Sequence, residues 1–117
     1  MSYPKEMKID EVVYVKKDEM DELSDNYYII RTNSAGVHAG EIVSREGKEV
    51  KLKNARRLYY WDGAATLSQL AMEGVEKPEN CKFPCEVNEI ILTEAIEIMP
   101  CTIQAQKSIK NVKVWEV

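Results

Sequence analysis

The sequence predicts an α+β fold: a curved antiparallel β-sheet of about five strands with two short helices, one after the central hairpin and one near the C-terminus. Three observations lead to this class. Short runs rich in β-branched and aromatic residues recur along the chain, a glycine turn joins two of them, and two further segments begin with helix caps. With 117 residues, of which 44% are hydrophobic, residues 1–117 are expected to form a single domain.

The first part of the chain is predicted to be mainly strand. The run YYIIRT at 27–32 joins aromatic and β-branched residues and predicts a strand, and EVVYVKK at 11–17 is a second β-rich run. The acidic stretch between them, 18–26, favours a loop or a single helical turn. The residues NSAG at 33–36 indicate a turn.

A hairpin is expected next, with residues 37–45 and 48–61 as its two strands around a glycine turn. The alternation of apolar and polar residues breaks at 54–55, which predicts a bulge. Because a bulge reverses the faces of the residues after it, the orientation of the two arginines that follow stays undecided.

The first helix is predicted to begin at Thr66. Thr66 and Gln69 form a capping box, T-x-x-Q, in which each side chain can satisfy a free backbone N–H. Leu67 and Leu70 lie on one face, which is the side expected to be buried. Gly74 then provides a suitable helix end.

The last third of the chain is predicted to contain a strand and a second helix. The alternating run TEAIEI at 93–98 predicts the strand, and Pro100 is expected to end it. Thr102 is a suitable N-cap for a helix over 103–110.

The charge balance limits the classes of partner. The chain has 16 basic and 20 acidic residues, a net charge of −4, whereas proteins that bind long DNA or RNA usually carry a basic surface. No stretch approaches the roughly 20 apolar residues of a membrane span, and the amino terminus lacks the apolar core of a signal peptide. We therefore expect a cytosolic protein that has no long nucleic acid and no membrane as partner.

Catalytic and metal sites are hard to assemble from this sequence. His38 is the single histidine and has no paired nucleophile motif. Cys81 and Cys85 are close in sequence, but a zinc site would still need Cys101 or His38, so ordinary buried thiols are the favoured interpretation. Neither glycine-rich nucleotide-binding motif occurs. We expect no catalytic residue, no metal and no cofactor.

Basic and aromatic residues gather in the segment 54–74, NARRLYYWDGAATLSQLAMEG. Here Arg56 and Arg57 precede three consecutive aromatic residues that end at Trp61. Arginine binds phosphate through a planar, bidentate group, and Tyr and Trp rings stack on bases. The segment therefore suits a small ligand that is both anionic and aromatic, such as a nucleotide. In the alternative interpretation the aromatic residues are core and the arginines a solvated edge.

A second basic cluster lies near the C-terminus, where Lys107 and Lys110 share one face of the predicted helix. Phe83, in a proline-bounded loop, could act as a stacking lid if the two basic clusters converge; otherwise it tucks the loop onto the core. Trp115 is expected to dock on its own domain or, the option that we favour, in a homo-oligomer.

The order and spacing of several motifs resemble a small phage-encoded family. The segments YYIIRTNSAGVHAGEI, NARRLYYWDGAATLSQLAMEG, CKFPCEV, ILTEAIEI and a terminal V-W are similar to the Thoeris anti-defence sponge proteins of the first type. The resemblance covers residues 27–115, so that 1–26 form an N-terminal extension and 27–117 the core ligand-binding domain.

The resemblance implies that the protein binds a ligand and catalyses no reaction. Sponge proteins of this type bind the cyclic ADP-ribose isomer that a bacterial TIR-domain protein makes on infection, and some also hold cyclic di- or trinucleotides. They sequester the signal without degrading it. They assemble as homo-oligomers, from dimers to larger forms such as a hexamer, with the signal pockets at a subunit interface.

Carried over by position, the resemblance also implies roles for individual residues. Arg57 should meet a phosphate or stack on the base, Phe83 should stack on adenine, and the two helix lysines should meet the pyrophosphate. The complete expected ligand-binding set is Arg56, Arg57, Trp61, Phe83, Lys107 and Lys110.

The helix lysines offer only point charges to the pyrophosphate, whereas arginine would bind it in a bidentate way. The chain departs from the family pattern at two places. Tyr59 stands where a Trp is expected, and Asn33 replaces an aromatic residue. These changes could alter the choice of ligand.

The leading hypothesis is a phage counter-defence protein that sequesters a cyclic nucleotide signal, a glycocyclic ADP-ribose, in the cytoplasm of the infected bacterial host. The first alternative is a protein-interaction module that binds a host or virion protein through an aromatic hot spot. The second is an enzyme that acts on a nucleotide with His38 or a cysteine as catalyst.

Overall fold

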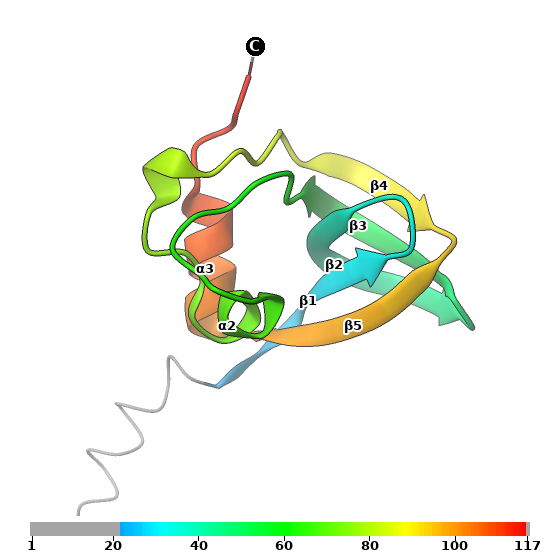
Figure 1. Ribbon diagram of the computed structural model, residues 1–117. Coiled ribbons are helices and arrows are strands. Elements are labelled where there is room, and N and C mark those ends of the chain that lie inside the picture. Colours follow the sequence, from blue (N-terminus) through cyan, green and yellow to red (C-terminus); the bar gives the residue numbers. More distant parts are fainter. Residues whose placement is uncertain (1–21, 117) are drawn as a thin grey trace, which may run out of the picture.

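The computed structural model describes residues 22–116, and five of its elements are strands of one antiparallel sheet. The strands are β1 (Leu23–Thr32), β2 (Val37–Glu46), β3 (Glu49–Arg57), β4 (Val87–Leu92) and β5 (Ala95–Thr102). The helical elements are α2 (Leu67–Glu73), the short 3₁₀ turn η2 (Pro78–Asn80) and α3 (Ile103–Asn111). The strand order is β4-β3-β2-β1-β5 (Figure 1). The predicted α+β class, with a five-stranded curved sheet and two helices, is confirmed.

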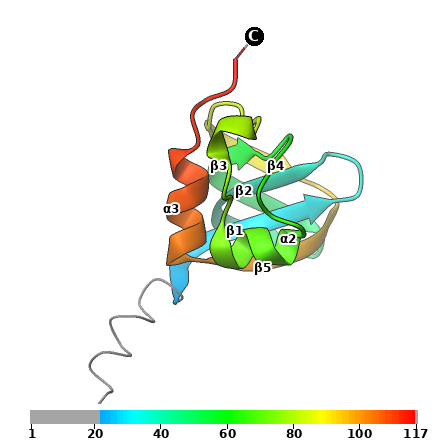
Figure 2. The same ribbon diagram turned by 60° about the vertical axis from the view of Figure 1, so that its left-hand side comes forward.

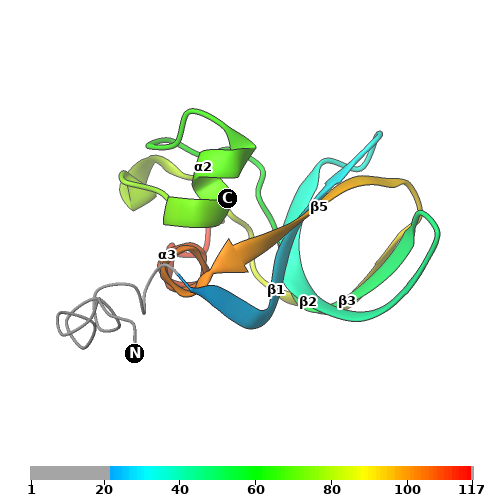
Figure 3. The same ribbon diagram turned by 90° about the horizontal axis from the view of Figure 1, so that it is seen from below.

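The curvature of the sheet follows from its connections. Strands β4 and β5 are the two edges of the sheet, yet only Thr93 and Glu94 separate them in the chain. The sheet must therefore curl until its edges approach each other at this end, and Figure 3 shows it bent into an open ring. The backbone N–H of Ala95 donates to the carbonyl of Lys48, 3.0 Å away, which fixes the β2–β3 turn against the start of β5.

Both faces of the central strands are buried, because the strands enclose one apolar cluster and the helices cover another. Figures 2 and 3 show the helices on the outside of the ring. Ile30 belongs to the inner cluster, which the strands alone supply, whereas its neighbour Ile29 belongs to the outer cluster beneath the helices. The outer cluster comprises Tyr27, Ile29, Ala39, Leu58, Leu70, Ala71, Cys81, Phe83, Cys101, Ala105, Ile109 and Val112. Burial on both faces explains why the centre of β1, YYII at 27–30, has four apolar residues in succession.

The predicted bulge is present in β3. Ala39 pairs with Arg56 and Glu41 with Lys53, so that one residue of β2 faces two of β3. Asn54 has a φ of 50° and donates through its side-chain amide to Glu41, 3.2 Å away. The bulge places Arg56 on the helix-covered face and Arg57 on the ring face, which settles the orientation that the sequence leaves open.

Both helices start at the predicted caps. The Thr66 hydroxyl accepts from the backbone N–H of Gln69 at 3.1 Å, and the Thr102 hydroxyl accepts from that of Ala105 at 3.0 Å. The Gln69 side chain reaches back to Ala65 instead of Thr66. Each cap therefore satisfies one of the backbone donors that a helix start leaves free.

Three predicted boundaries are wrong. Strand β1 already starts at Leu23, so the predicted loop over 18–26 ends earlier, and β3 ends at Arg57 instead of continuing to residue 61. Pro100 does not end β5, which continues to Thr102. An edge strand tolerates proline because only one of its sides is paired. The predicted β-rich run at 11–17 lies outside the described residues.

Gly74 is the glycine on which the packing of the two helices depends. It ends α2 with φ 80° and ψ −155°, a region that only glycine populates readily, and a Cβ at this position would overlap the Ser108 side chain of α3. Its backbone N–H donates to the Leu70 carbonyl at 2.9 Å. The close approach of α2 to α3 therefore requires glycine here.

We expect Gly74→Ala to lower the free energy of unfolding by about 3 kcal/mol, the sum of backbone strain and overpacking. Gly47→Ala is the matched control, because Gly47 also has a positive φ, 58°, but a Cβ there meets nothing within 4 Å. This control should lose only about 1 kcal/mol. Urea unfolding followed by tryptophan fluorescence measures both, and equal losses would contradict the packing argument.

Candidate functional site

The segment 82–86 joins most of the basic and aromatic residues that the sequence singles out. Lys82 exchanges two backbone hydrogen bonds with Tyr60, at 2.7 and 3.3 Å. The next residue, Phe83, accepts at its carbonyl from the backbone N–H of Trp115, at 3.0 Å. At its other end, Glu86 lies 3.7 Å from the ammonium group of Lys110. We call this stretch the Phe83 segment.

Arg56 holds the Phe83 segment in place. Its guanidinium donates to the carbonyls of Pro84 at 2.8 Å, Phe83 at 3.0 Å and Ile109 at 2.9 Å. The side chain is buried, and this desolvation lowers the pKa of its guanidinium. Arg56 thus fastens β3 to both the Phe83 segment and the end of α3, and in this arrangement it is a structural residue instead of the expected ligand contact.

Phe83 is also part of the core. Its ring is completely buried in the outer cluster, with the Arg56 guanidinium 5.5 Å from the ring centre. The expected stacking lid is therefore not exposed in this structure, and the alternative interpretation, a phenylalanine that tucks its loop onto the core, is the one that the structure favours. Trp61 is half-buried and packs against the same cluster.

Exposed aromatic rings lie beside the Phe83 segment. Tyr59 and Trp115 stack in parallel, with ring centres 5.5 Å apart and an angle of 8° between the planes. The ammonium group of Lys82 lies 5.9 Å from the ring centre of Tyr60 and 5.7 Å from that of Trp115. We call Tyr59, Tyr60, Lys82 and Trp115 the aromatic platform. Tyr59 is 63% and Tyr60 50% exposed, so the rings have free faces.

Trp115 contacts the rest of its own chain through the aromatic platform. Trp115 docks on Tyr59 of its own chain but keeps 39% of its surface exposed. The expected ligand-binding set includes Trp61 from the aromatic triplet, whereas the exposed members are Tyr59 and Tyr60. The set also lacks Lys82, although the position of this residue directly before Phe83 in the CKFP motif is a signal that could have identified it.

Lys110 is the predicted helix residue that reaches the Phe83 segment. Besides its contact with Glu86, its ammonium group lies 5.5 Å from the ring centre of Tyr27. Lys107 is exposed one helical turn earlier on α3. The fold therefore brings Arg56, Phe83 and Lys110 together.

Arg57 lies apart from this group, because its side chain leaves the opposite face of β3. It donates to the carbonyl of Ala35 and lines a small cavity of about 170 Å³ together with His38 and Cys85. The two basic clusters thus do not converge on one pocket within a single chain.

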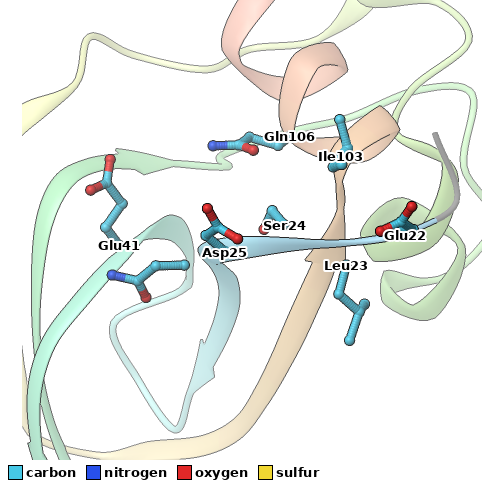
Figure 4. Close-up of a pocket in the computed structure, with 8 residues that line it drawn as sticks. Glu22, Leu23, Ser24, Asp25, Glu41, Ile103 and Gln106 are labelled. Atoms are coloured by element: carbon cyan, nitrogen blue, oxygen red, sulfur yellow. The ribbon is translucent and has the colours of Figure 1, made fainter. Parts of the chain in front are cut away.

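A larger cavity lies at the start of β1, and it is acidic. Its volume is about 400 Å³, and it is lined by the acidic residues Glu22, Asp25 and Glu41 and by Ile103 and Gln106 of α3. Figure 4 shows these side chains. No residue of the expected ligand-binding set lines it. Its negative charge makes it unsuitable for a phosphate-bearing ligand.

The cysteines and the histidine do not form a metal site in the described part of the chain, where no group of three or more His, Cys, Asp or Glu side chains is arranged to hold an ion. Cys101 is fully buried, and burial raises the pKa of its thiol to about 12. Cys81 is buried as well, with a raised pKa from the same cause, whereas Cys85 is exposed. The structure thus favours buried thiols for two of the three cysteines.

The dependence of the structure on Arg56 is testable. In Arg56→Lys a single ammonium group cannot reach three carbonyls, so we expect the free energy of unfolding to fall by roughly 2–4 kcal/mol. Arg57→Lys, at the neighbouring exposed position, should lose less than about 1 kcal/mol. Chemical denaturation compares the two variants, and a similar loss in both would contradict the structural role of Arg56.

His38 predicts a pH dependence of stability. It is 1% exposed, and its pKa is lowered, first by burial and then by the nearby charge of Arg57. The unfolded chain therefore takes up the proton more readily, and stability should fall as the pH drops below about 6.5. In His38→Gln, unfolding between pH 7.5 and 5.5 should depend less on pH; an unchanged slope would contradict a neutral buried histidine.

Comparison with known proteins gives a family but no function. No curated protein and no solved structure matches the chain. Within residues 22–116 no helix is long and apolar enough to cross a membrane. One family model, described as a domain of unknown function (DUF6948), matches residues 25–109, which is more than half of the chain. The protein therefore belongs to the DUF6948 family.

Proposed function

We propose that this protein is a phage counter-defence protein that binds a cyclic nucleotide signal, of the cyclic ADP-ribose class, and sequesters it unchanged in the cytoplasm of the infected bacterial host. Cyclic di- and trinucleotides are further candidate ligands. The resemblance of the motifs to anti-defence sponge proteins suggests the ligand class. The observation that carries the proposal is the convergence of exposed aromatic rings and cations from three parts of the chain on the Phe83 segment.

The chemistry of this surface suits a nucleotide. Free faces of Tyr59 and Tyr60 can stack on a base, and Lys82 supplies a positive charge at the same place. Lys110, at the far end of the Phe83 segment, can meet a phosphate. Binding without turnover needs stacking and charge but no general base.

Tight sequestration needs more than one open surface. Nanomolar affinity corresponds to about 12 kcal/mol, which a single exposed stacking face with screened lysines does not supply. We therefore infer that a second copy of the chain covers the bound ligand and that the protein acts as a homo-oligomer. The exposed part of Trp115 and the separate position of Arg57 support this, since each could complete a pocket of the partner copy.

One observation favours a second candidate function, a protein-interaction module. Exposed Tyr and Trp residues are also typical of hot spots in protein interfaces, and the platform combines three of them. In that case the partner would be a host or virion protein, and no cyclic nucleotide would bind.

Native mass spectrometry with a panel of cyclic ADP-ribose isomers and cyclic di- and trinucleotides tests the proposal. We expect an oligomer that gains a fixed number of unmodified ligand masses. Lys82→Ala and Lys110→Ala should each weaken binding at least fivefold, because each removes a charge that meets the ligand. Ligand released by heat should keep its mass, which separates a sponge from an enzyme.

Lys48→Ala is the matched control, because Lys48 is an exposed lysine in the β2–β3 turn, away from the Phe83 segment. Its loss should leave the affinity unchanged. A protein that binds no member of the panel would overturn the proposed function and favour the interaction module. An equal effect of all three lysine variants would keep the function but reject the site.

A further inference from the structure

Tyr27 carries a polar group that the fold leaves without a partner. Its side chain is 1% exposed, and within the described residues its hydroxyl forms no hydrogen bond. A buried hydroxyl without a partner is costly, because it gives up its bonds to water without replacement. Burial also raises the pKa of Tyr27 well above its usual value, so the hydroxyl keeps its proton and is a free donor.

Two cations accompany this donor. The ammonium group of the exposed Lys110 lies 5.5 Å from the ring centre of Tyr27. The charge of the buried Arg56 also acts on Tyr27. Arg56 donates to carbonyls alone and has no carboxylate within ion-pair distance among residues 22–116. A free donor and two positive groups together form an environment that favours an anion.

A carboxylate of the chain itself lies at this position. Glu86 approaches the Lys110 ammonium group at 3.7 Å, with both side chains more than a third exposed. The contact is too long for a hydrogen bond, and an exposed pair of this kind is weak. Glu86 directly precedes β4 and Lys110 lies in the last turn of α3, so rotation of the two side chains separates them without any change in the backbone.

We propose that Glu86 is a built-in competitor: its carboxylate occupies the place beside Lys110 that a phosphate group of the ligand takes when it binds. Displacement of Glu86 lets the phosphate contact Lys110 and accept a hydrogen bond from the Tyr27 hydroxyl. A ligand must then bind Lys110 more strongly than the Glu86 carboxylate does. A doubly charged phosphate meets this requirement better than a single carboxylate. The inference rests on the proposed function, because it names two further residues of that site.

The charge of Glu86 is the first point to test. In Glu86→Gln the competing charge is gone while the shape is kept, and we expect binding to tighten at least threefold. Glu89→Gln is the matched control, since Glu89 lies three residues further along, in β4, and pairs with Lys51 at 3.3 Å. Isothermal titration with inorganic pyrophosphate and with the cyclic nucleotide panel measures both variants. Equal affinities in the two variants would overturn the competitor role.

The hydroxyl of Tyr27 is the second point. Tyr27→Phe should weaken binding at least threefold, while its unfolding midpoint should not fall, because the variant loses a hydroxyl that has no partner. An unchanged affinity would mean that the hydroxyl meets only water and would reject its role in the site. A fall in both affinity and stability would reject it too, because that result indicates a structural hydroxyl.

The two proposals fail in different ways. If the wild-type protein binds no cyclic nucleotide but its affinity for pyrophosphate rises in Glu86→Gln, the proposed function fails and the anion site stands. If the wild-type protein binds a cyclic nucleotide and neither Glu86→Gln nor Tyr27→Phe changes the affinity, the proposed function stands and the inference fails.

Discussion

The arrangement of the whole helix-covered face depends on one side chain, the guanidinium of Arg56. Its three carbonyl partners belong to the Phe83 segment and to the last turn of α3, two parts of the chain that no strand pairing connects. Because the fixed geometry of a guanidinium directs several donors at once, it can fix a loop that lacks regular structure. The cost of burying the charge is offset by these bonds and by the Phe83 ring beneath it. The loop then serves as a rigid base for its neighbours.

Contacts with the Phe83 segment fix the positions of the aromatic platform and of the Lys110 side chain. Tyr60 and Trp115 bond to the backbone of Lys82 and Phe83, and Lys110 reaches Glu86. The exposed side chains are therefore held by buried backbone contacts, as is usual where loops carry function on a fixed scaffold. The bulge at Asn54 is the second requirement, because it sends Arg56 to the helix side and Arg57 to the ring side. A strand without it would exchange the two arginines.

Local signals in the sequence predict much of this fold, and distant contacts explain the errors. Four predictions rest on residues that are close in sequence, and all four are confirmed. They are the helix caps at Thr66 and Thr102, the end of α2 at Gly74 and the bulge in β3. The predicted end of β5 at Pro100 is wrong because an edge strand tolerates proline, and strand order is not visible in any local pattern. The burial of Arg56 and of Phe83 stays open in the sequence for a similar reason. Their burial arises from Ile109 and the outer cluster, far away in sequence. Family membership follows from the match over 25–109, whereas the ligand stays a proposal.

The short link between β4 and β5 has a consequence for how the chain folds. Strand β5 must cross from one edge of the sheet to the other within Thr93 and Glu94, so it can pair with β1 only after β1 to β4 have already curled. The pairing of β1 with β5, which joins Leu23 to Thr102, is thus the most distant strand pairing among the described residues, and its entropy of loop closure opposes the formation of its contacts. We therefore expect closure of the ring to be a late event, and α3, which follows β5 directly, to dock together with it.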